Sequence, residues 1–145
     1  MNTSKHRFAH TALTVSDLDT TVAFYLSLGF QKQWMHEMAS PEVAKLFGLT
    51  RARARVAYLT MGSNALEIYQ FFEPVGRDMG RVMRPVDRGI SHISVLVEDL
   101  DAVYAMLTEN GYEANSSPVA ISPTARAVVF RDPDGIAVEL FEAKA

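Results

Sequence analysis

An internal repeat is the feature that most constrains the fold of this chain. Residues 10–30 align without a gap with residues 92–112, at a constant offset of 82 residues. The positions that are identical in the two segments are His10/His92, Val15/Val97, Asp17/Asp99, Leu18/Leu100, Asp19/Asp101, Ala23/Ala105 and Gly29/Gly111. An Asp-Leu-Asp sequence can recur by chance, but hardly with a histidine and a glycine in the same register. The repeat therefore predicts two copies of one supersecondary unit.

Each copy begins with the pattern of a strand followed by a helix. Residues 10–15 and 92–97 alternate in polarity, and in both segments the histidine lies on the less apolar face. A strand whose apolar face packs on a helix would turn its histidine away from that helix. The helix caps that we expect are Ser16 or Asp17 and Asp99 at the N-termini, and Gly29 and Gly111 at the C-termini, each followed by an aromatic residue that starts the next strand.

Three further strands complete each copy. The clearest are two hairpins, 53–61 with 66–72 and 126–131 with 136–141, whose turns are Gly-Ser-Asn and Asp-Pro-Asp-Gly; the first copy also carries a short helix within 40–49. We therefore predict an α+β protein in which residues 1–145 form one domain of two βαβββ modules. The modules span about 8–72 and 90–142, and a linker or flap at 73–89 joins them.

Composition narrows the possible partners. The net charge of -3 provides no basic surface for nucleic acid and no polybasic stretch for a membrane. No apolar run approaches the roughly 20 residues of a spanning helix, and the N-terminus lacks the apolar core of a signal peptide. We therefore expect a cytoplasmic protein that binds neither nucleic acid nor membrane and takes a small molecule as its partner.

A histidine and a glutamate occupy matching positions in the two copies. His10 and His92 begin the first strands, and Glu67 and Glu139 lie in the last strands between apolar neighbours of the opposite face. Both pairs are predicted on the face turned away from the helix. A single histidine or glutamate in a strand is more often structural or solvated than a ligand. The repetition of both residue types favours a common site.

These four residues have the chemistry of a metal site. The chain has no cysteine, so a metal must take nitrogen and oxygen ligands. Two imidazoles and two carboxylates suit one divalent ion such as Ni, Co, Zn, Mn, Fe or Mg. Two positions of an octahedron would remain open, which catalysis at a metal requires. We therefore predict that His10, Glu67, His92 and Glu139 bind one divalent metal ion.

The segments that carry these residues resemble the vicinal oxygen chelate superfamily, which includes glyoxalase I, methylmalonyl-CoA epimerase, extradiol dioxygenases, fosfomycin-modifying enzymes and bleomycin-binding proteins. The resemblance extends from Phe8 to Glu142 and is most specific at 10–25, 65–68, 89–93 and 132–141. It implies that the paired modules form a U-shaped cleft of mixed sheets around the ion, with the same four ligands. It also implies a homodimer, and the ligands could converge within one chain or across a swapped dimer.

The resemblance implies a metal-dependent isomerase, epimerase or lyase that acts on a small, enolisable carbonyl compound. The ion would bind the carbonyl oxygen and stabilise the enediolate formed on proton loss. Glu139 or Glu67, released from the metal, would remove and return the proton. Glu139 is the first choice because its hairpin is the closest to the family motif.

Two alternatives remain open. An extradiol-type dioxygenase uses two histidines and one carboxylate on iron, and Glu67 as a fourth ligand disfavours that chemistry. A non-enzymatic binding or resistance protein would use the cleft without metal, although its bleomycin-binding relatives lack these ligands. The residues that could line such a cleft are Tyr58, Tyr69, Phe71, Phe141, Met79 and Met83.

Other residues add detail to these hypotheses. The arginine that holds glutathione in glyoxalase I is missing after His10, which puts a glutathione substrate in doubt, whereas residues 73–78 resemble an epimerase loop. Glu42 is a candidate second acid. Arg55 and Arg126 are candidates for a phosphate or carboxylate of the substrate. His6 and His36 have no partner in the repeat and no assigned role, and Trp34 belongs either to a pocket or to the core.

Overall fold

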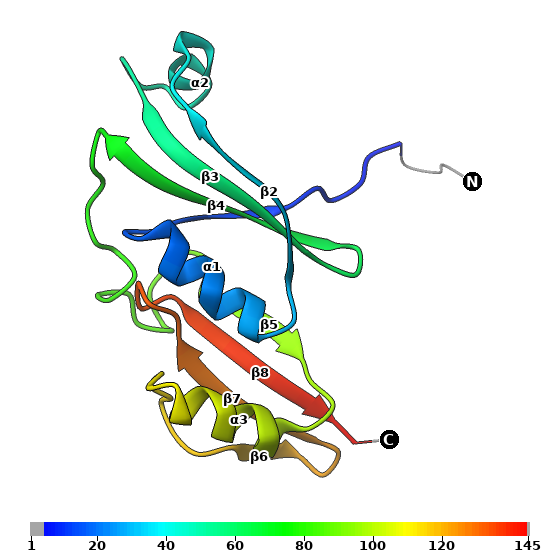
Figure 1. The fold of residues 1–145 in the computed structure, drawn as a ribbon. Coiled ribbons are helices and arrows are strands. Elements are labelled where there is room, and N and C mark those ends of the chain that lie inside the picture. The colour runs from blue at the N-terminus through cyan, green and yellow to red at the C-terminus, as the bar shows by residue number, and fades with distance from the viewer. Residues whose placement is uncertain (1–4, 145) are drawn as a thin grey trace. The chain divides into compact units, whose positions relative to one another are not determined.

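The computed structural model describes residues 5–144 and divides into two compact units, Met1–Gly76 and Arg77–Ala145 (Figure 1). Unit 1 contains β1 (Thr11–Thr14), α1 (Leu18–Ser27), β2 (Gln31–Met38), α2 (Pro41–Leu46), β3 (Arg53–Met61) and β4 (Asn64–Glu73). Unit 2 contains β5 (Ile93–Leu96), α3 (Leu100–Glu109), β6 (Val119–Ser122), β7 (Ala125–Arg131) and β8 (Ala137–Ala143). Both hairpins and the short helix α2 lie where the sequence predicts them.

The two units have the same sheet topology. Their strand orders are β1-β4-β3-β2 and β5-β8-β7-β6, and in each the first strand runs parallel to the last while the other pairs are antiparallel. The register also repeats, because Ala12 lies opposite Glu67 and its repeat equivalent Ser94 lies opposite Glu139. The predicted α+β fold of two βαβββ modules, each with a four-stranded mixed sheet, is confirmed.

Each long helix begins at an aspartate cap. The backbone N–H of Thr20 donates to Asp17 Oδ1 at 2.9 Å, and that of Ala102 donates to Asp99 Oδ1 at 2.9 Å. Asp17, not Ser16, is thus the first cap. A cap of this kind contributes about 1 kcal/mol of helix stability. At the other ends Gly29 and Gly111 adopt positive φ angles of 99° and 84°, as their predicted positions require.

A salt bridge between an arginine and an aspartate links each long helix to its sheet. Arg55 on β3 donates to both carboxylate oxygens of Asp19 on α1, at 2.9 and 3.1 Å. Arg126 on β7 donates to both oxygens of Asp101 on α3, at 3.0 and 2.6 Å. Hydrogen bonding to the guanidinium lowers the pKa of each aspartate. We expected these arginines to bind a substrate. The structure instead gives them a structural role, because each guanidinium group is already bound to an aspartate of a helix.

A second contact joins helix and sheet in each unit. The backbone N–H of Leu18, at the start of α1, donates to Gln70 Oε1 on β4 at 3.0 Å. The N–H of Leu100, at the start of α3, donates to Glu142 Oε1 on β8 at 3.0 Å. Each of these N–H groups would otherwise lack an intrahelical partner. Because Leu18 and Leu100 are fully buried, these bonds hold the helix start against the core.

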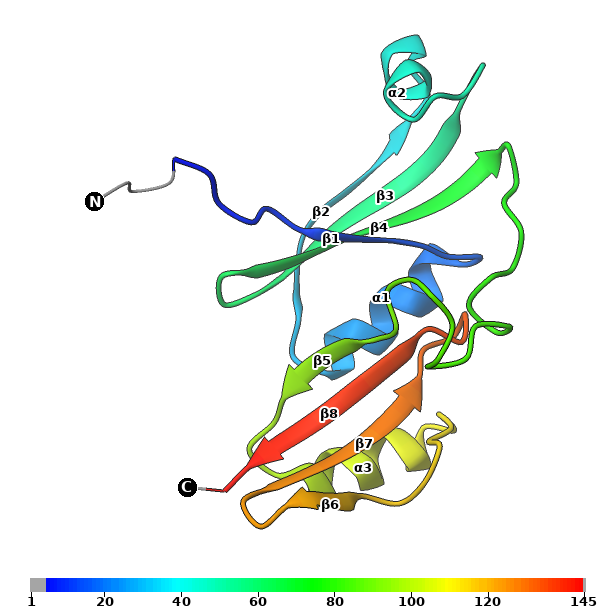
Figure 2. The ribbon, with the colours of Figure 1, turned by 180° about the vertical axis from the view of Figure 1, so that it is seen from behind.

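The helix side of each sheet carries the core. In unit 1 the apolar residues of β3 and β4 that face α1 are Ala57, Leu59, Leu66 and Ile68, all buried. In unit 2 the corresponding residues are Val128, Phe130, Val138 and Leu140. Figure 1 views unit 2 from the α3 side, and Figure 2 views its sheet from the opposite side. In the described part of the chain no helix is long and apolar enough to span a membrane.

One predicted strand starts later than expected. We expected a strand to begin at Tyr112, directly after the glycine that ends α3. Instead Ala114 forms an isolated bridge with Phe130, and β6 begins only at Val119. The intervening Ser-Ser-Pro sequence interrupts the pairing, because Pro118 has no N–H to donate to the ladder.

Candidate functional site

The four predicted ligands lie on the side of their sheets that faces away from the helices, here called the open face. Side chains alternate along a strand, so Glu67 points to the face opposite the buried Leu66 and Ile68, and Glu139 to the face opposite Val138 and Leu140. His10 and His92 each stand one residue before the first strand of a unit. The first strand and the last strand are neighbours, and this adjacency brings each histidine to a glutamate.

In unit 1 the pair is in direct contact. His10 Nε2 lies 3.0 Å from Glu67 Oε2, and the two side chains are 36% and 16% exposed, respectively. The imidazole edge also meets the ring of Tyr58, with centroids 6.1 Å apart at 86°. Tyr58 lies directly opposite Glu67 on β3. The histidine is thus held between a carboxylate and an aromatic ring while staying accessible to solvent.

In unit 2 the matching pair is wider. His92 Nε2 lies 3.9 Å from Glu139 Oε1, and the two side chains are 42% and 25% exposed, respectively. Ser94 donates a hydrogen bond of 2.7 Å to Glu139 Oε1, and Ser91 Oγ lies 2.7 Å from His92 Nδ1. Nδ1 is therefore engaged, which leaves Nε2 as the ring nitrogen that faces the carboxylate.

Two hydroxyl groups next to these glutamates were not predicted to support them, although the sequence made Tyr69 a candidate for the lining of a cleft. Tyr69, two residues beyond Glu67 on the same face of β4, is buried, and burial followed by a hydrogen bond with Glu67 raises its pKa. Ser94 supplies the corresponding contact to Glu139 from β5. Alternation along β4 could have indicated Tyr69, whereas the role of Ser94 depends on the register between two distant strands.

An aromatic row extends from the His10–Glu67 pair across the open face of unit 1. Trp34 stacks on Tyr58 with centroids 5.1 Å apart at 11°, and on His36 at 4.7 Å and 24°. Trp34 is 39% exposed. It therefore belongs to the open face of the sheet and not to the core, which resolves the alternative left by the sequence.

The remaining candidates lie in three places. Phe71 stacks on Tyr69 on the open face of unit 1, and Phe141 shares its face with Glu139. Met79 is exposed, in the segment that follows β4. Glu42 lies in the first turn of α2, where hydrogen bonding to its backbone and to Ser40 lowers its pKa. A lowered pKa favours a carboxylate over the protonated form that an acid needs.

The spacing of the donor atoms in unit 1 fits a divalent cation, whereas the 3.9 Å between His92 Nε2 and Glu139 Oε1 in unit 2 is wider. Two ligands at the usual distances of about 2.0–2.2 Å from a metal, set at a right angle, lie roughly 3 Å apart, and His10 Nε2 and Glu67 Oε2 are 3.0 Å apart. Within either unit, no third histidine, aspartate or glutamate among the described residues joins the pair to form a larger cluster. One such pair alone is an ordinary His–Glu contact. The metal interpretation depends on two pairs of the same type in the same register.

The topology and the repeated His–Glu pair define a protein built from duplicated βαβββ modules. The sequence profile of the Glyoxalase/Bleomycin resistance protein/Dioxygenase superfamily matches residues 7–140, and the chain belongs to this superfamily. The superfamily includes metal-dependent enzymes.

Individual relatives agree with this assignment. The chain is 29% identical over 136 residues to the uncharacterized protein YwkD of Bacillus subtilis, covering 92% of this chain and 94% of the relative. It is 25% identical over 143 residues to the mitochondrial methylmalonyl-CoA epimerase of Homo sapiens, covering 94% of this chain and 74% of the relative. A glyoxalase family protein from Bacillus cereus has the same fold, with a TM-score of 0.93 at 22% identity and coverage of 100% and 99%.

Proposed function

We propose that this protein is a divalent-metal-dependent isomerase, epimerase or lyase that acts on a small, enolisable carbonyl compound. The observation that carries the proposal is the pair of matching His–Glu contacts, His10 with Glu67 and His92 with Glu139. Similarity to an epimerase over nearly the whole chain supports the reaction class. A homodimer and a cytoplasmic location remain predictions.

The proposed ligands are His10, Glu67, His92 and Glu139. A divalent cation bound there would polarise a substrate carbonyl and stabilise the negative charge that develops on its oxygen. Nδ1 of His92 is engaged by Ser91, so Nε2 is the nitrogen available as a ligand. Tyr69 and Ser94 orient the two carboxylates, as partners of metal ligands commonly do.

Glu139 is the proposed base. Its Oε1 accepts the hydrogen bond from Ser94, which leaves Oε2 to take a proton from the carbon next to the carbonyl. The same oxygen returns the proton to that carbon or to its neighbour, so the reaction is a net isomerisation or epimerisation. The side chain is three-quarters buried, which limits its competition with water.

Metal binding is the first test. We expect about one transition-metal ion per chain by elemental analysis, lost in a His10→Ala, Glu139→Ala double variant. A His36→Ala variant is the matched control, because His36 is an exposed histidine of the same unit as His10 without an ion-paired carboxylate in the described residues. No metal after reconstitution of the wild type would overturn the enzymatic proposal.

The base assignment needs a separate test. Deuterium incorporation from D2O into 2-hydroxy and 2-keto compounds, followed by NMR, detects proton removal without knowledge of the product. We expect Glu139→Gln to slow exchange by about 10²–10⁴-fold while metal remains bound. Full exchange activity in a metal-loaded Glu139→Gln protein would assign the base elsewhere, and Glu67→Gln is then the next variant.

One observation favours a second function, the binding of a small molecule without turnover. The exposed stack of Trp34 on Tyr58 offers a planar apolar surface to a ligand. Absence of metal together with saturable quenching of Trp34 fluorescence by aromatic compounds would support this reading over the enzyme.

A further inference from the structure

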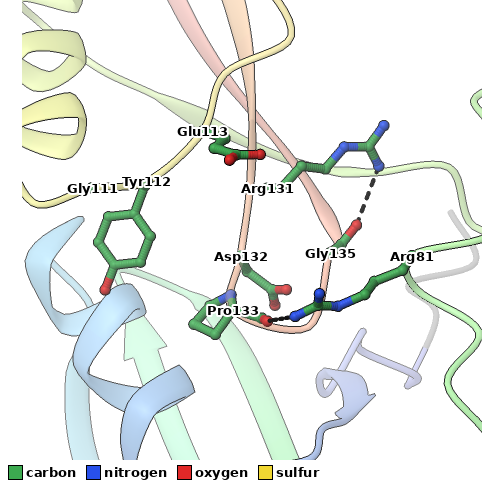
Figure 3. A pocket seen from close by; sticks show the side chains of 8 residues that line it. All are labelled: Arg81, Gly111, Tyr112, Glu113, Arg131, Asp132, Pro133 and Gly135. Carbon is green, nitrogen blue, oxygen red and sulfur yellow. Dashed lines mark hydrogen bonds between the residues drawn. The ribbon is translucent and has the colours of Figure 1, made fainter.

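Unit 2 contains a cavity of about 440 Å³ beside the turn that joins β7 to β8 (Figure 3). Its walls come from that turn, from the segment after α3 and from the segment that precedes β5. The lining residues are Arg81, Gly111, Tyr112, Glu113, Arg131, Asp132, Pro133 and Gly135. None of them is a proposed metal ligand, so the cavity is a feature separate from the His92–Glu139 pair.

Arg131 distinguishes this cavity. The described part of the chain has three half-buried arginines, Arg55, Arg126 and Arg131. The first two are held by the paired aspartates of α1 and α3. Arg131 forms no ion pair with a carboxylate among residues 5–144 and donates one hydrogen bond, of 3.2 Å, to the carbonyl of Gly135. A half-buried guanidinium with most of its five N–H donors directed at no carboxylate is suited to an added anion.

A second arginine, Arg81, lines the same cavity. Arg81 donates to the carbonyl of Pro133 at 3.3 Å, and its Nε lies 3.7 Å from Asp78 (Figure 3). Two glycines permit this close approach. A Cβ at Gly135 would lie 2.8 Å from Arg81 Cγ, and a Cβ at Gly80 would lie 2.6 Å from the carbonyl of Asp134. The backbone around Arg81 is therefore packed directly on the turn.

The acidic residues of the cavity do not occupy Arg131. Asp132 is 4% exposed, and its Oδ1 accepts the backbone N–H groups of Asp134 and Ile136 inside the turn. Glu113 is exposed at the cavity wall and is the acidic lining residue that the turn does not enclose. Its carboxylate would oppose an entering anion, which gives the experiment a variant expected to bind more tightly.

Arg131 also shares a face with the proposed catalytic pair. It lies directly opposite Ala137 on β8, two residues before Glu139 on the same face. Diagonal neighbours of this kind have Cα atoms about 7–8 Å apart. His92 follows in the same row on the far side of Ala137, because Ile93 pairs with Val138. A group bound at Arg131 is therefore within the span of a small metabolite from His92 and Glu139.

We propose that this cavity binds an oxyanionic group of the substrate, a carboxylate or a phosphate, with Arg131 as the main contact and Arg81 as the second. Guanidinium forks match both groups because each presents two oxygens to paired N–H donors. That the other end of the substrate is a carbonyl group rests on the proposed function. The substrate class thus becomes a small carbonyl compound that carries an anionic group.

The test is a titration of metal-free protein, monitored by amide NMR at constant ionic strength. Inorganic phosphate and acetate are the two probes. We expect saturable shifts at Gly111 and Gly135, which line the cavity, and an affinity reduced at least about tenfold in Arg131→Gln. The matched control is Arg84→Gln, an exposed arginine of the same unit paired with Asp87, which should bind as the wild type does.

Two more variants separate lost binding from lost folding. Glu113→Gln should bind either probe more tightly, a gain that a damaged fold cannot produce. Arg131→Lys keeps the charge but not the fork, so its affinity should fall between those of the wild type and Arg131→Gln. A preference for phosphate or for acetate identifies which anion the substrate carries.

Equal binding by the wild type and Arg131→Gln, or shifts that avoid Gly111 and Gly135, would overturn the proposal. The titration requires neither metal nor turnover. Anion binding in a protein that takes up no metal would therefore contradict the proposed function alone, whereas metal uptake without anion binding would contradict this inference alone.

Discussion

Ser94 donates a hydrogen bond of 2.7 Å to Glu139, while the equivalent position opposite Glu67 is Ala12, which has no hydroxyl. In unit 1 the hydroxyl comes instead from Tyr69, along the same strand as the glutamate. Each candidate ligand carboxylate thus has one hydroxyl partner, but from a different element. The two copies provide the same support by different residues.

The Ser94 contact gives the first prediction. Ser94→Ala should weaken the affinity of the protein for a divalent metal by about tenfold, because partners that orient metal ligands commonly contribute that much. Calorimetric titration with Zn²⁺ measures the change. Ser122→Ala is the control, since Ser122 lies on β6 and bonds within its own turn. Unchanged affinity in Ser94→Ala would mean that Ser94 does not position a ligand.

The single tryptophan gives an optical prediction. Trp34 stacks on Tyr58, and Tyr58 contacts His10. A paramagnetic ion such as Ni²⁺ bound at His10 lies near the indole and should quench its fluorescence, whereas diamagnetic Zn²⁺ should quench it far less. The quenching should disappear in His10→Ala. Equal quenching in that variant would show that the ion binds elsewhere.

Close packing at the β7–β8 turn predicts an unequal effect of two glycine substitutions. Gly135 and Gly111 both have φ of 84°, so alanine at either position is strained by roughly 1–2 kcal/mol. A Cβ at Gly111 meets open space, but at Gly135 it would also lie 3.2 Å from Arg81 Cα and 3.3 Å from Arg81 N. Urea unfolding should therefore show a larger loss for Gly135→Ala. Equal losses would contradict the close approach of Arg81.

The ion pair between Asp101 and Arg126 predicts a pH-dependent stability difference. Its hydrogen bonds lower the pKa of Asp101 from the usual 3.8. The folded state therefore keeps this carboxylate ionised at a lower pH than the unfolded chain does. The stabilisation is complete above the unfolded pKa and is lost as pH falls through the folded value. Asp101→Asn should be less stable than the wild type at pH 7, with the difference vanishing in acid.

Denaturant unfolding between pH 7 and pH 2 tests this. Glu98→Gln is the control, because Glu98 is exposed just before α3 and has no ion-pair partner among residues 5–144. Its stability difference from the wild type should not collapse over the range in which that of Asp101→Asn does. A pH-independent deficit in Asp101→Asn would assign the contribution of this residue to helix capping or packing.

The sequence predicted most of the elements and the face on which each candidate ligand lies, but not the start of β6. Alternation and helical spacing are local, so the repeat predicted both long helices, the aspartate caps and the hairpins. It failed where a pairing depends on a distant partner. Arg55 and Asp19 are 36 residues apart and Arg126 and Asp101 are 25 apart. No local pattern indicates that these arginines bind helices and not a substrate.

The candidate site was predicted in part: the sequence identified the residues that the repeat marks, but not Arg131. His10 and His92 were identified because both copies repeat them, and the parallel pairing of the first and last strands explains why each meets a glutamate. Arg131 was not singled out, because nothing local in the sequence distinguishes it from the other arginines and it has no repeat partner among the candidate ligands. Arg131 stands out only in the structure, where the other two half-buried arginines form ion pairs and Arg131 forms none within residues 5–144.

The two sides of each sheet differ in how closely the two copies agree. On the helix side, Arg55 and Arg126 are equivalent and chemically identical. On the open side, Tyr58 lies opposite Glu67, whereas Val129 lies opposite Glu139. Substitutions on the open side leave the salt bridges between helix and sheet intact. Two units built on one scaffold can therefore offer different surfaces to a ligand.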